Sequence, residues 1–182
     1  MEKPKLGLTS EDHKNLSDKI DVIIHAAANV SHYGEYSKYY ASNLQSTLNL
    51  LQFAGEGIKK DLNYISTRDV VEQGHIESHS FYVLSEYDTQ EKLKQKYPNN
   101  YIKTKYEAEN AVIEARKRDL NTNIFRLGNL VFNTKNGGFQ ENISTNAFFI
   151  MLKAFVKTGI INSLIDKAEL SYIDTTAKGI LA

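Results

Sequence analysis

The sequence predicts an α/β protein with a mainly parallel sheet, and three observations support that prediction. Short apolar runs rich in β-branched residues alternate with segments of helical spacing, which is typical of a sheet covered by helices. The runs are continuous rather than alternating, which indicates strands buried on both faces. A chain of 182 residues is also long enough for one domain with a sizeable core.

The expected strands are "DVIIHAA" at residues 21–27, "LNYIST" at 62–67 and "TNIFRLGN" at 122–129. A weaker fourth strand is expected at "ELSYID", residues 169–174. All four runs contain the β-branched or aromatic residues that favour an extended backbone.

Helices are expected at residues 35–57, 101–118 and 144–159. The first ends in two glycines that act as a helix stop, and the second is rich in Ala, Glu, Lys and Arg, which are strong helix formers. The first helix also carries one apolar stripe at helical spacing, which we expect to face the core. Its members are Tyr36, Tyr40, Leu44, Leu48 and Leu51.

The composition excludes several classes of function. Lys and Arg total 22 and Asp and Glu total 22, so the net charge gives no case for nucleic acid or an anionic membrane as partner. The absence of Cys excludes disulfides, thiolate metal sites and a cysteine nucleophile. The first residues are charged and lack the apolar run of a secretory signal, and the most apolar run in the sequence is interrupted by Lys153 and is too short to span a bilayer. We therefore expect a soluble, cytoplasmic protein.

Residues 72–100 form the longest segment without a clear pattern. A loop of this length is either functional, as a lid or substrate-contacting segment, or disordered. His75 and His79 within it share a metal-like spacing, but they have no clear third ligand. We interpret them as solvated loop histidines and predict no metal site.

Tyr101 and Lys105 are the first candidates for chemistry. They are four residues apart in an expected helix, so the phenol and the ammonium share one face. A nearby cation lowers the pKa of a tyrosine, which would make Tyr101 a proton donor to an oxyanion at neutral pH. The spacing alone is also common in amphipathic helices whose residues have no such role.

Two neighbouring segments strengthen the catalytic interpretation. Ser66 and Thr67 end the "YIST" strand, and open α/β sheets place ligands at such strand ends. The run "HAAANV" closes the preceding strand with small residues, which would let a flat cofactor lie against the backbone. The alternatives are that the hydroxyls form turns and that the small residues serve close helix–sheet packing.

The order of these segments resembles the extended short-chain dehydrogenase/reductases. Within them it is most similar to the thioester reductase domains that end non-ribosomal peptide synthetases and to the related carboxylic acid reductases. Those domains carry "KPxLGL", "DxIIHxAAxV" and a Tyr-x-x-x-Lys helix with an "xAE" tail, which appear here as "KPKLGL", "DVIIHAAANV" and "YIKTKYEAE". Tyr172-Ile173-Asp174 replaces the family's Pro-Val-Asp turn, a mild departure.

The resemblance implies a catalytic triad of Thr67, Tyr101 and Lys105. Thr67 and Tyr101 would polarise the thioester carbonyl, and Tyr101 would protonate the oxyanion. Lys105 would hold the nicotinamide ribose and lower the pKa of Tyr101. The cofactor-binding residues that the resemblance implies are Ala26, Ala27, Ala28, Val30, Asn43, Ser66, Lys105, Leu127, Gly128 and Asn129.

The implied cofactor is NADPH, and the implied substrate is an acyl or peptidyl thioester on the phosphopantetheine arm of a carrier protein. Hydride transfer and loss of the thiol would release an aldehyde, which a second reduction would convert to an alcohol. The nearest enzymatic alternative is an NAD-dependent sugar-nucleotide epimerase or dehydratase, which uses the same Tyr–Lys pair. An alternative of another class is a catalytically inactive folded fragment or binding module.

No Gly-rich turn of the dinucleotide-binding type follows a first strand in this sequence. We therefore expect residues 1–182 to form a single fragment with a partial Rossmann-like, doubly wound parallel sheet that lacks its first three strands. Such a fragment would bind the cofactor weakly or not at all and be inactive alone. The strand at residues 21–27 would then be an exposed apolar edge, and we expect it to favour self-association.

Overall fold

The computed structural model describes residues 1–31, 33–72, 97, 99–141, 143–161 and 170–182. The described residues form two compact units, Met1–Arg126 and Leu127–Ala182. Each unit is described by itself below.

The first unit is built on a three-stranded sheet with the order β1-β2-β3. Its strands are β1 (Val22–His25), β2 (Asp61–Thr67) and β3 (Thr122–Leu127). β1 and β2 are parallel, and β3 also runs parallel to β2, because the Asn121–Asp61 and Asn123–Asn63 side-chain hydrogen bonds advance in the same direction. The three strong strand predictions and the α/β class are confirmed.

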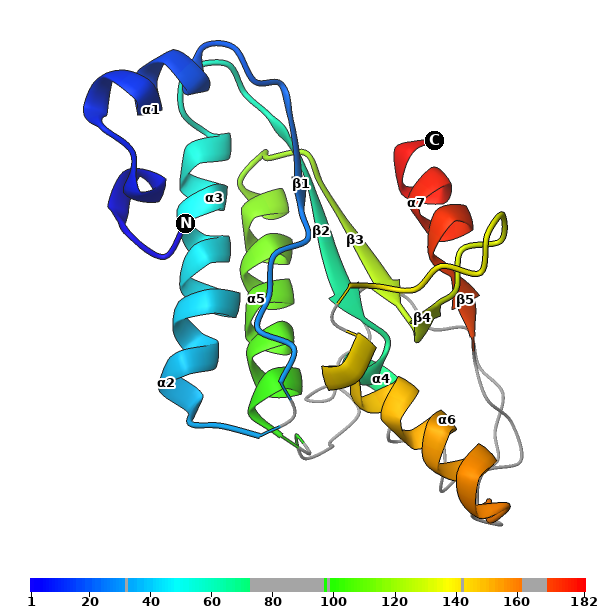
Figure 1. Cartoon of the computed structure of the whole chain (residues 1–182). Helices are drawn as coiled ribbons and strands as arrows, with labels where there is room; N and C mark the ends of the chain where they lie inside the picture. Colours follow the sequence, from blue (N-terminus) through cyan, green and yellow to red (C-terminus); the bar gives the residue numbers. More distant parts are fainter. Residues whose placement is uncertain (32, 73–96, 98, 142, 162–169) are drawn as a thin grey trace. The chain divides into compact units, whose positions relative to one another are not determined.

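Two long helical segments lie side by side along one face of this sheet (Figure 1). One consists of α2 (Tyr36–Tyr39), the π-helical turn η2 (Tyr40–Gln45) and α3 (Ser46–Ala54), and the other is α5 (Asn100–Lys117). The Asn99 side chain caps α5 by accepting a hydrogen bond from the backbone N–H of Ile102 at 2.9 Å. This cap fixes where the helix with Tyr101 and Lys105 begins.

The main core lies between these helices and β2. Leu62, Ala54, Ala108 and Val112 are completely buried there, and Tyr64 is 1% exposed. Burying a side chain of the size of Leu or Val contributes about 1.5–3 kcal/mol each. The core therefore holds α5 firmly against β2, which is the contact that positions the site.

The buried face of the first helical segment differs from the expected stripe. Tyr40 and Leu48 are more than one-third exposed, whereas Tyr39, Asn43 and Thr47 are buried. The prediction failed because it searched for apolar residues only, while this helix buries polar side chains that make hydrogen bonds. The π-helical turn also shifts the phase of the helix, which a constant helical period does not represent.

The remaining elements of the first unit are short. They are η1 (Pro4–Gly7), α1 (Ser10–Ser17) and α4 (Asp69–Glu72). The Thr9 hydroxyl caps α1 by accepting from the N–H of Asp12.

The second unit pairs two short parallel strands, β4 (Leu130–Val131) and β5 (Ser171–Tyr172). Its helices are η3 (Ile143–Thr145), α6 (Ala147–Thr158) and α7 (Ile173–Leu181). The weak strand prediction is confirmed as β5. The predicted end of the third helix at residue 159 is confirmed as well, because Gly159 follows α6 in a left-handed conformation.

β1 forms one edge of the three-stranded sheet. Val22 and Ile24 on it are 49% and 46% exposed, so the expected apolar edge is present in the structure. Self-association through this edge stays a prediction.

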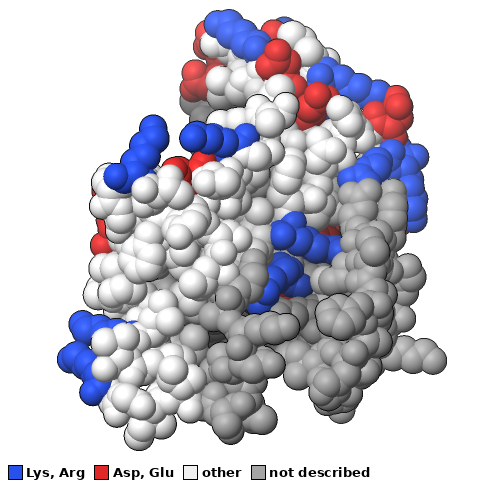
Figure 2. Space-filling view, turned by 90° about the vertical axis from the view of Figure 1, so that its right-hand side faces the viewer, with Lys and Arg blue, Asp and Glu red and all other residues white. Residues whose placement is uncertain are grey.

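No helix among the described residues is long and apolar enough to cross a membrane. Figure 2 shows Lys and Arg side chains interspersed with Asp and Glu on the face it presents, in line with the zero net charge of the sequence.

Candidate active site

The structure brings Tyr101 and Thr67 together. Tyr101 lies in the first turn of α5, Thr67 is the last residue of β2, and the Thr67 hydroxyl lies close enough to the phenol to influence its pKa. Thr67 is buried, and its Oγ1 also accepts from the backbone N–H of Asp69 at 3.3 Å. Two hydroxyls from different elements thus converge at the carboxyl end of the central strand.

The expected effect of Lys105 on Tyr101 is not found. Burial and the negative charge of Asp69 raise the pKa of Tyr101 to about 12, and the nearby Thr67 hydroxyl opposes this rise only in part. The prediction of a lowered pKa assumed that the ammonium acts on the phenol, but the structure directs it elsewhere. Tyr101 therefore keeps its proton throughout the neutral range, as a proton donor must.

Lys105 points its ammonium at the strand. Its Nζ donates to the carbonyl oxygen of Ile65 at 2.6 Å and lies 4.2 Å from the centre of the Tyr64 ring. The side chain is only 3% exposed, and burial lowers its pKa to about 7, against the charge of Glu109, which raises it. Lys105 can therefore gain or lose a proton near neutral pH.

Ser66, the residue before Thr67 on β2, has a buried hydroxyl without a hydrogen-bond partner among the described residues. The residue is 5% exposed. Buried polar atoms are nearly always paired, so an unpaired hydroxyl between Ile65 and Thr67 indicates a place where a ligand or water completes the site. This observation fits the implied position of Ser66 beside the nicotinamide.

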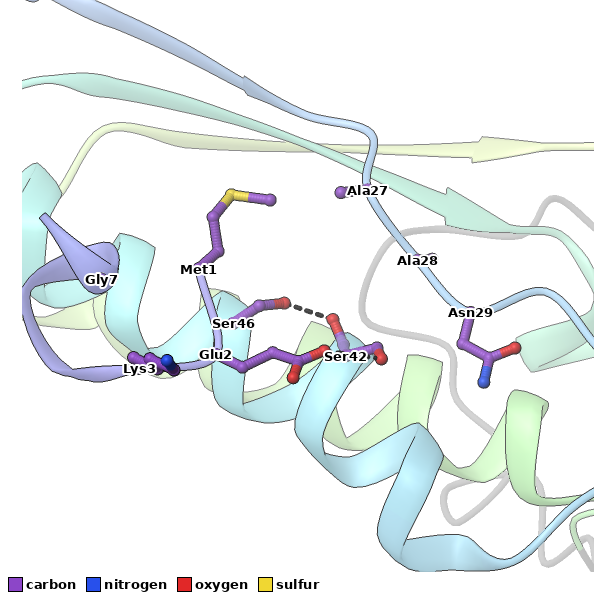
Figure 3. A pocket seen from close by; sticks show the side chains of 9 residues that line it. All are labelled: Met1, Glu2, Lys3, Gly7, Ala27, Ala28, Asn29, Ser42 and Ser46. Carbon is purple, nitrogen blue, oxygen red and sulfur yellow. Dashed lines mark hydrogen bonds between the residues drawn. The ribbon is translucent and has the colours of Figure 1, made fainter.

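The residues after β1 fit a cofactor surface. Ala26 and Ala27 are exposed, Ala28 is partly buried, and Val30 is 62% exposed. Small side chains there leave the backbone open to a flat ring. A cavity of about 470 Å³ extends from this loop to η2 and the N-terminal residues (Figure 3). It is lined by Met1, Glu2, Lys3, Gly7, Ala27, Ala28, Asn29, Ser42 and Ser46.

Asn43 braces the site and does not line its cavity. Its Oδ1 accepts from the backbone N–H of Asn29, and its Nδ2 donates to the carbonyl of Asn29 and to Thr104 Oγ1. The expected supporting role fits these contacts, whereas its direct contact with a cofactor stays a prediction. The sequence patterns did not identify Asn29 and Thr104. Asn29 was marked only as a polar residue in the run "HAAANV", and Thr104 lies between two lysines with no signal of its own.

His25 is the buried last residue of β1. It is 2% exposed, and its Nε2 lies 3.0 Å from Thr47 Oγ1. Thr47 Oγ1 donates to the carbonyl of Asn43, so Nε2 is the nitrogen that donates to Thr47. His25 is therefore a packed and hydrogen-bonded residue of the first unit.

The roles of all the site residues remain predictions, and for two groups the first unit gives no placement. Leu127, Gly128 and Asn129 belong to the second unit, where the carbonyl of Asn129 accepts from the N–H of Ser171 at 2.9 Å. His75 and His79 lie outside the described residues.

The parallel sheet, the Tyr-x-x-x-Lys helix and the hydroxyl pair at the strand end define a Rossmann-like domain of the short-chain dehydrogenase/reductase type. The chain belongs to the NAD-binding family described as male sterility protein, whose model matches residues 1–180. The resemblance found in the sequence is confirmed by this match.

Individual relatives narrow the resemblance. The chain is 29% identical over 196 residues to the L-2-aminoadipate reductase large subunit of Candida glabrata, a match covering all of this chain and 14% of that protein. The terminal R domain from the myxalamid PKS-NRPS biosynthetic pathway superposes with a TM-score of 0.85 at 27% identity, covering 99% of this chain and 44% of that one. A thiolation-reductase di-domain from an archaeal non-ribosomal peptide synthetase gives 0.79 at 32% identity, covering 98% and 48%.

UDP-glucuronic acid 4-epimerase from Bacillus cereus, solved in complex with NAD, is also similar, with a TM-score of 0.69 at 20% identity over 98% of this chain and 53% of that one. This likeness shows a shared fold only. The chain spans less than half of each of the two reductase structures and about one-seventh of the aminoadipate reductase subunit.

Proposed function

We propose that this chain carries the catalytic residues of an NADPH-dependent thioester reductase. The observation that supports the proposal most is the position of Tyr101 next to the hydroxyl of Thr67, with Lys105 one turn further along the same helix. The reductase relatives, which include a carboxylic acid reductase of Mycobacterium tuberculosis, support the reaction class.

The two hydroxyls suit a thioester carbonyl. Thr67 and Tyr101 would donate hydrogen bonds to its oxygen and so polarise the carbon. NADPH, when bound, supplies the hydride that the carbon accepts. The fit of this cofactor rests on the unpaired Ser66 hydroxyl and on the small residues of Ala26 to Ala28.

Tyr101 would act as the proton donor. With a pKa of about 12 it holds a proton at neutral pH and can transfer it to the oxyanion that forms at the former carbonyl oxygen. The tetrahedral product then loses the thiol, leaving an aldehyde. One thioester, one NADPH and one proton thus give one aldehyde, one thiol and NADP⁺.

The proposed substrate is an acyl or peptidyl group on the phosphopantetheine arm of a carrier protein. The archaeal relative, a thiolation-reductase di-domain, supports such a partner. A second reduction of the aldehyde would give the alcohol. An NAD-dependent sugar-nucleotide epimerase is the second candidate, and only the shared fold favours it.

The test measures two reactions of the full-length protein that carries these residues: NADPH oxidation with an acyl-pantetheine thioester, and conversion of a nucleotide sugar in the presence of NAD. We expect thioester-dependent oxidation that Tyr101→Phe abolishes. Turnover of the nucleotide sugar in place of the thioester would overturn the proposal in favour of the epimerase. A protein that turns over neither substrate, although it is folded, would favour the binding module.

A further inference from the structure

Glu109 continues the row of functional side chains on α5. Tyr101, Lys105 and Glu109 occur at successive intervals of four residues, so all three lie along one face of the helix. The Glu109 carboxylate is completely buried, although it follows Lys105 by only one turn. Burying a charged carboxylate is unfavourable unless a group of opposite charge lies next to it.

Arg126 on β3 neutralises this carboxylate. Its Nε donates to both oxygens of Glu109 at 3.1 Å, and its Nη2 lies 2.6 Å from Oε2. The guanidinium side chain is only 11% exposed. A bidentate pair of this kind offsets the cost of burying the two charges.

The contacts of Lys105 itself carry no formal charge. Its ammonium meets a backbone carbonyl and an aromatic ring, and it is almost wholly buried. Glu109 is the carboxylate whose charge stabilises it. Among the described residues, the titratable groups around Lys105 are Tyr101 and Glu109 on α5, Tyr64 on β2 and His25 on β1. Arg126 on β3 pairs with Glu109, and Asp69 acts on Tyr101.

We propose that Glu109 and Arg126 form a positioning pair for the Lys105 ammonium, in which the Glu109 carboxylate offsets the charge of Lys105 and Arg126 shares that carboxylate. Neither residue contacts the reacting atoms in this arrangement. The inference deepens the proposed function, and its relevance to catalysis rests on that function, because Lys105 is a catalytic residue only if the chain is a reductase.

The two partners have opposite effects on Lys105. Glu109→Gln removes the negative charge and leaves two buried cations, so protonation of Lys105 becomes harder. Arg126→Gln removes the competing cation, so Glu109 acts on Lys105 alone and protonation becomes easier. A pair that served only to hold the fold together would not move the titration of Lys105 in opposite directions.

The experiment is a pH titration of the full chain labelled with ¹³C at the lysine ε-carbon, followed by NMR. The Lys105 signal is assigned as the one lost in Lys105→Arg. Relative to the unmodified chain, whose Lys105 has a pKa of about 7, we expect Glu109→Gln to lower this pKa by about one pH unit and Arg126→Gln to raise it. The matched control is Glu114→Gln, which removes an exposed carboxylate paired with Lys117 on the same helix. It should leave the Lys105 titration unchanged.

Shifts in the same direction, or no shift in either variant, would overturn the proposal. If Glu109→Gln does not fold, Arg126→Gln decides alone, and an unchanged or lowered Lys105 pKa overturns it. The titration needs no turnover, so its result is independent of the proposed function. The pH profile of kcat/KM in the full-length protein tests that function separately. If the Lys105 pKa shifts in the variants but the pH profile of kcat/KM does not, the positioning pair is supported and the catalytic role of Lys105 is contradicted.

Discussion

The amide of Asn43 holds both backbone polar groups of Asn29. Its Oδ1 accepts from the N–H of Asn29 at 2.7 Å, and its Nδ2 donates to the carbonyl of the same residue at 3.2 Å. The same Nδ2 donates to Thr104 Oγ1 at 3.0 Å, on the residue before Lys105. One buried side chain therefore connects the loop after β1 to the helix that carries the proposed catalytic pair.

Asn43→Ala should destabilise the first unit strongly for a single polar residue. It leaves the N–H of Asn29 without its buried acceptor, and such a loss costs about 1–3 kcal/mol. The matched control is Gln45→Ala. Gln45 lies two residues after Asn43 in the same helical segment, and its amide donates a hydrogen bond within that segment, to Asn49. Urea unfolding of both variants measures the difference, and equal losses would contradict the bracing role of Asn43.

Tyr101→Phe should lower kcat/KM of the full-length protein by about 10²- to 10⁴-fold with the proposed thioester substrate, because the proton donor is lost. Thr67→Val, which keeps the shape of the side chain, should cause a smaller loss, because Tyr101 still binds and protonates the oxygen. Both variants should unfold at nearly the same urea concentration as the unmodified protein. A Tyr101→Phe enzyme of full activity would remove Tyr101 from the mechanism.

The folded chain should lose stability in mild acid through His25. Burial, with a smaller contribution from the Lys105 charge, lowers its pKa from 6.5 to about 4. As the pH falls below 6.5, the unfolded chain takes up a proton that the folded chain does not bind until about pH 4. Stability from this group is therefore complete above pH 6.5 and falls by about 3 kcal/mol as the pH approaches 4.

The measurement is the free energy of unfolding in urea as a function of pH, for the unmodified chain and for His25→Gln. The variant should be less stable at neutral pH, because it changes a packed and hydrogen-bonded residue. Its decline between neutral and acid pH should nevertheless be shallower. Identical slopes for the two proteins would show that other groups control the acid response.

Lys60 should contribute more to the free energy of unfolding than its neighbour Lys59. Its buried ammonium donates to three backbone carbonyls, those of Ser17, Glu56 and Ile58. Lys60→Met keeps the aliphatic stem but leaves these acceptors without their donor, which should cost about 2 kcal/mol or more. Lys59→Met removes only an exposed pair with Asp119 and should change the free energy of unfolding by less than about 1 kcal/mol. Equal effects of the two substitutions would contradict this difference.

Much of the fold could be predicted because its strands are marked locally. The run "DVIIHAA" and the run "LNYIST" identify β1 and β2 without reference to the rest of the chain. The Tyr101–Thr67 encounter could also be expected, because parallel strand ends and the following helix meet at one edge of such a sheet.

Other features depend on distances that the sequence does not state. The direction of the Tyr101 pKa shift follows from burial and from where the Lys105 ammonium points, and both are products of packing. The Glu109–Arg126 pair joins residues from different elements, so no local pattern reveals it. The buried polar face around Asn43 was missed because hydrophobic periodicity does not detect polar residues that find partners inside the protein.

The π-helical turn η2 acts as a one-residue offset between two halves of one helix. After it, Leu50 and Leu51 contribute to the core, whereas within it Asn43 reaches the loop after β1 and Thr104. The π turn between Tyr40 and Gln45 takes up one residue more than an α-helical turn, so the residues after it are displaced by one position from a constant helical register. In an alignment or a redesign of this segment, the helical positions before and after η2 must therefore be assigned separately, because a single helical register does not describe both.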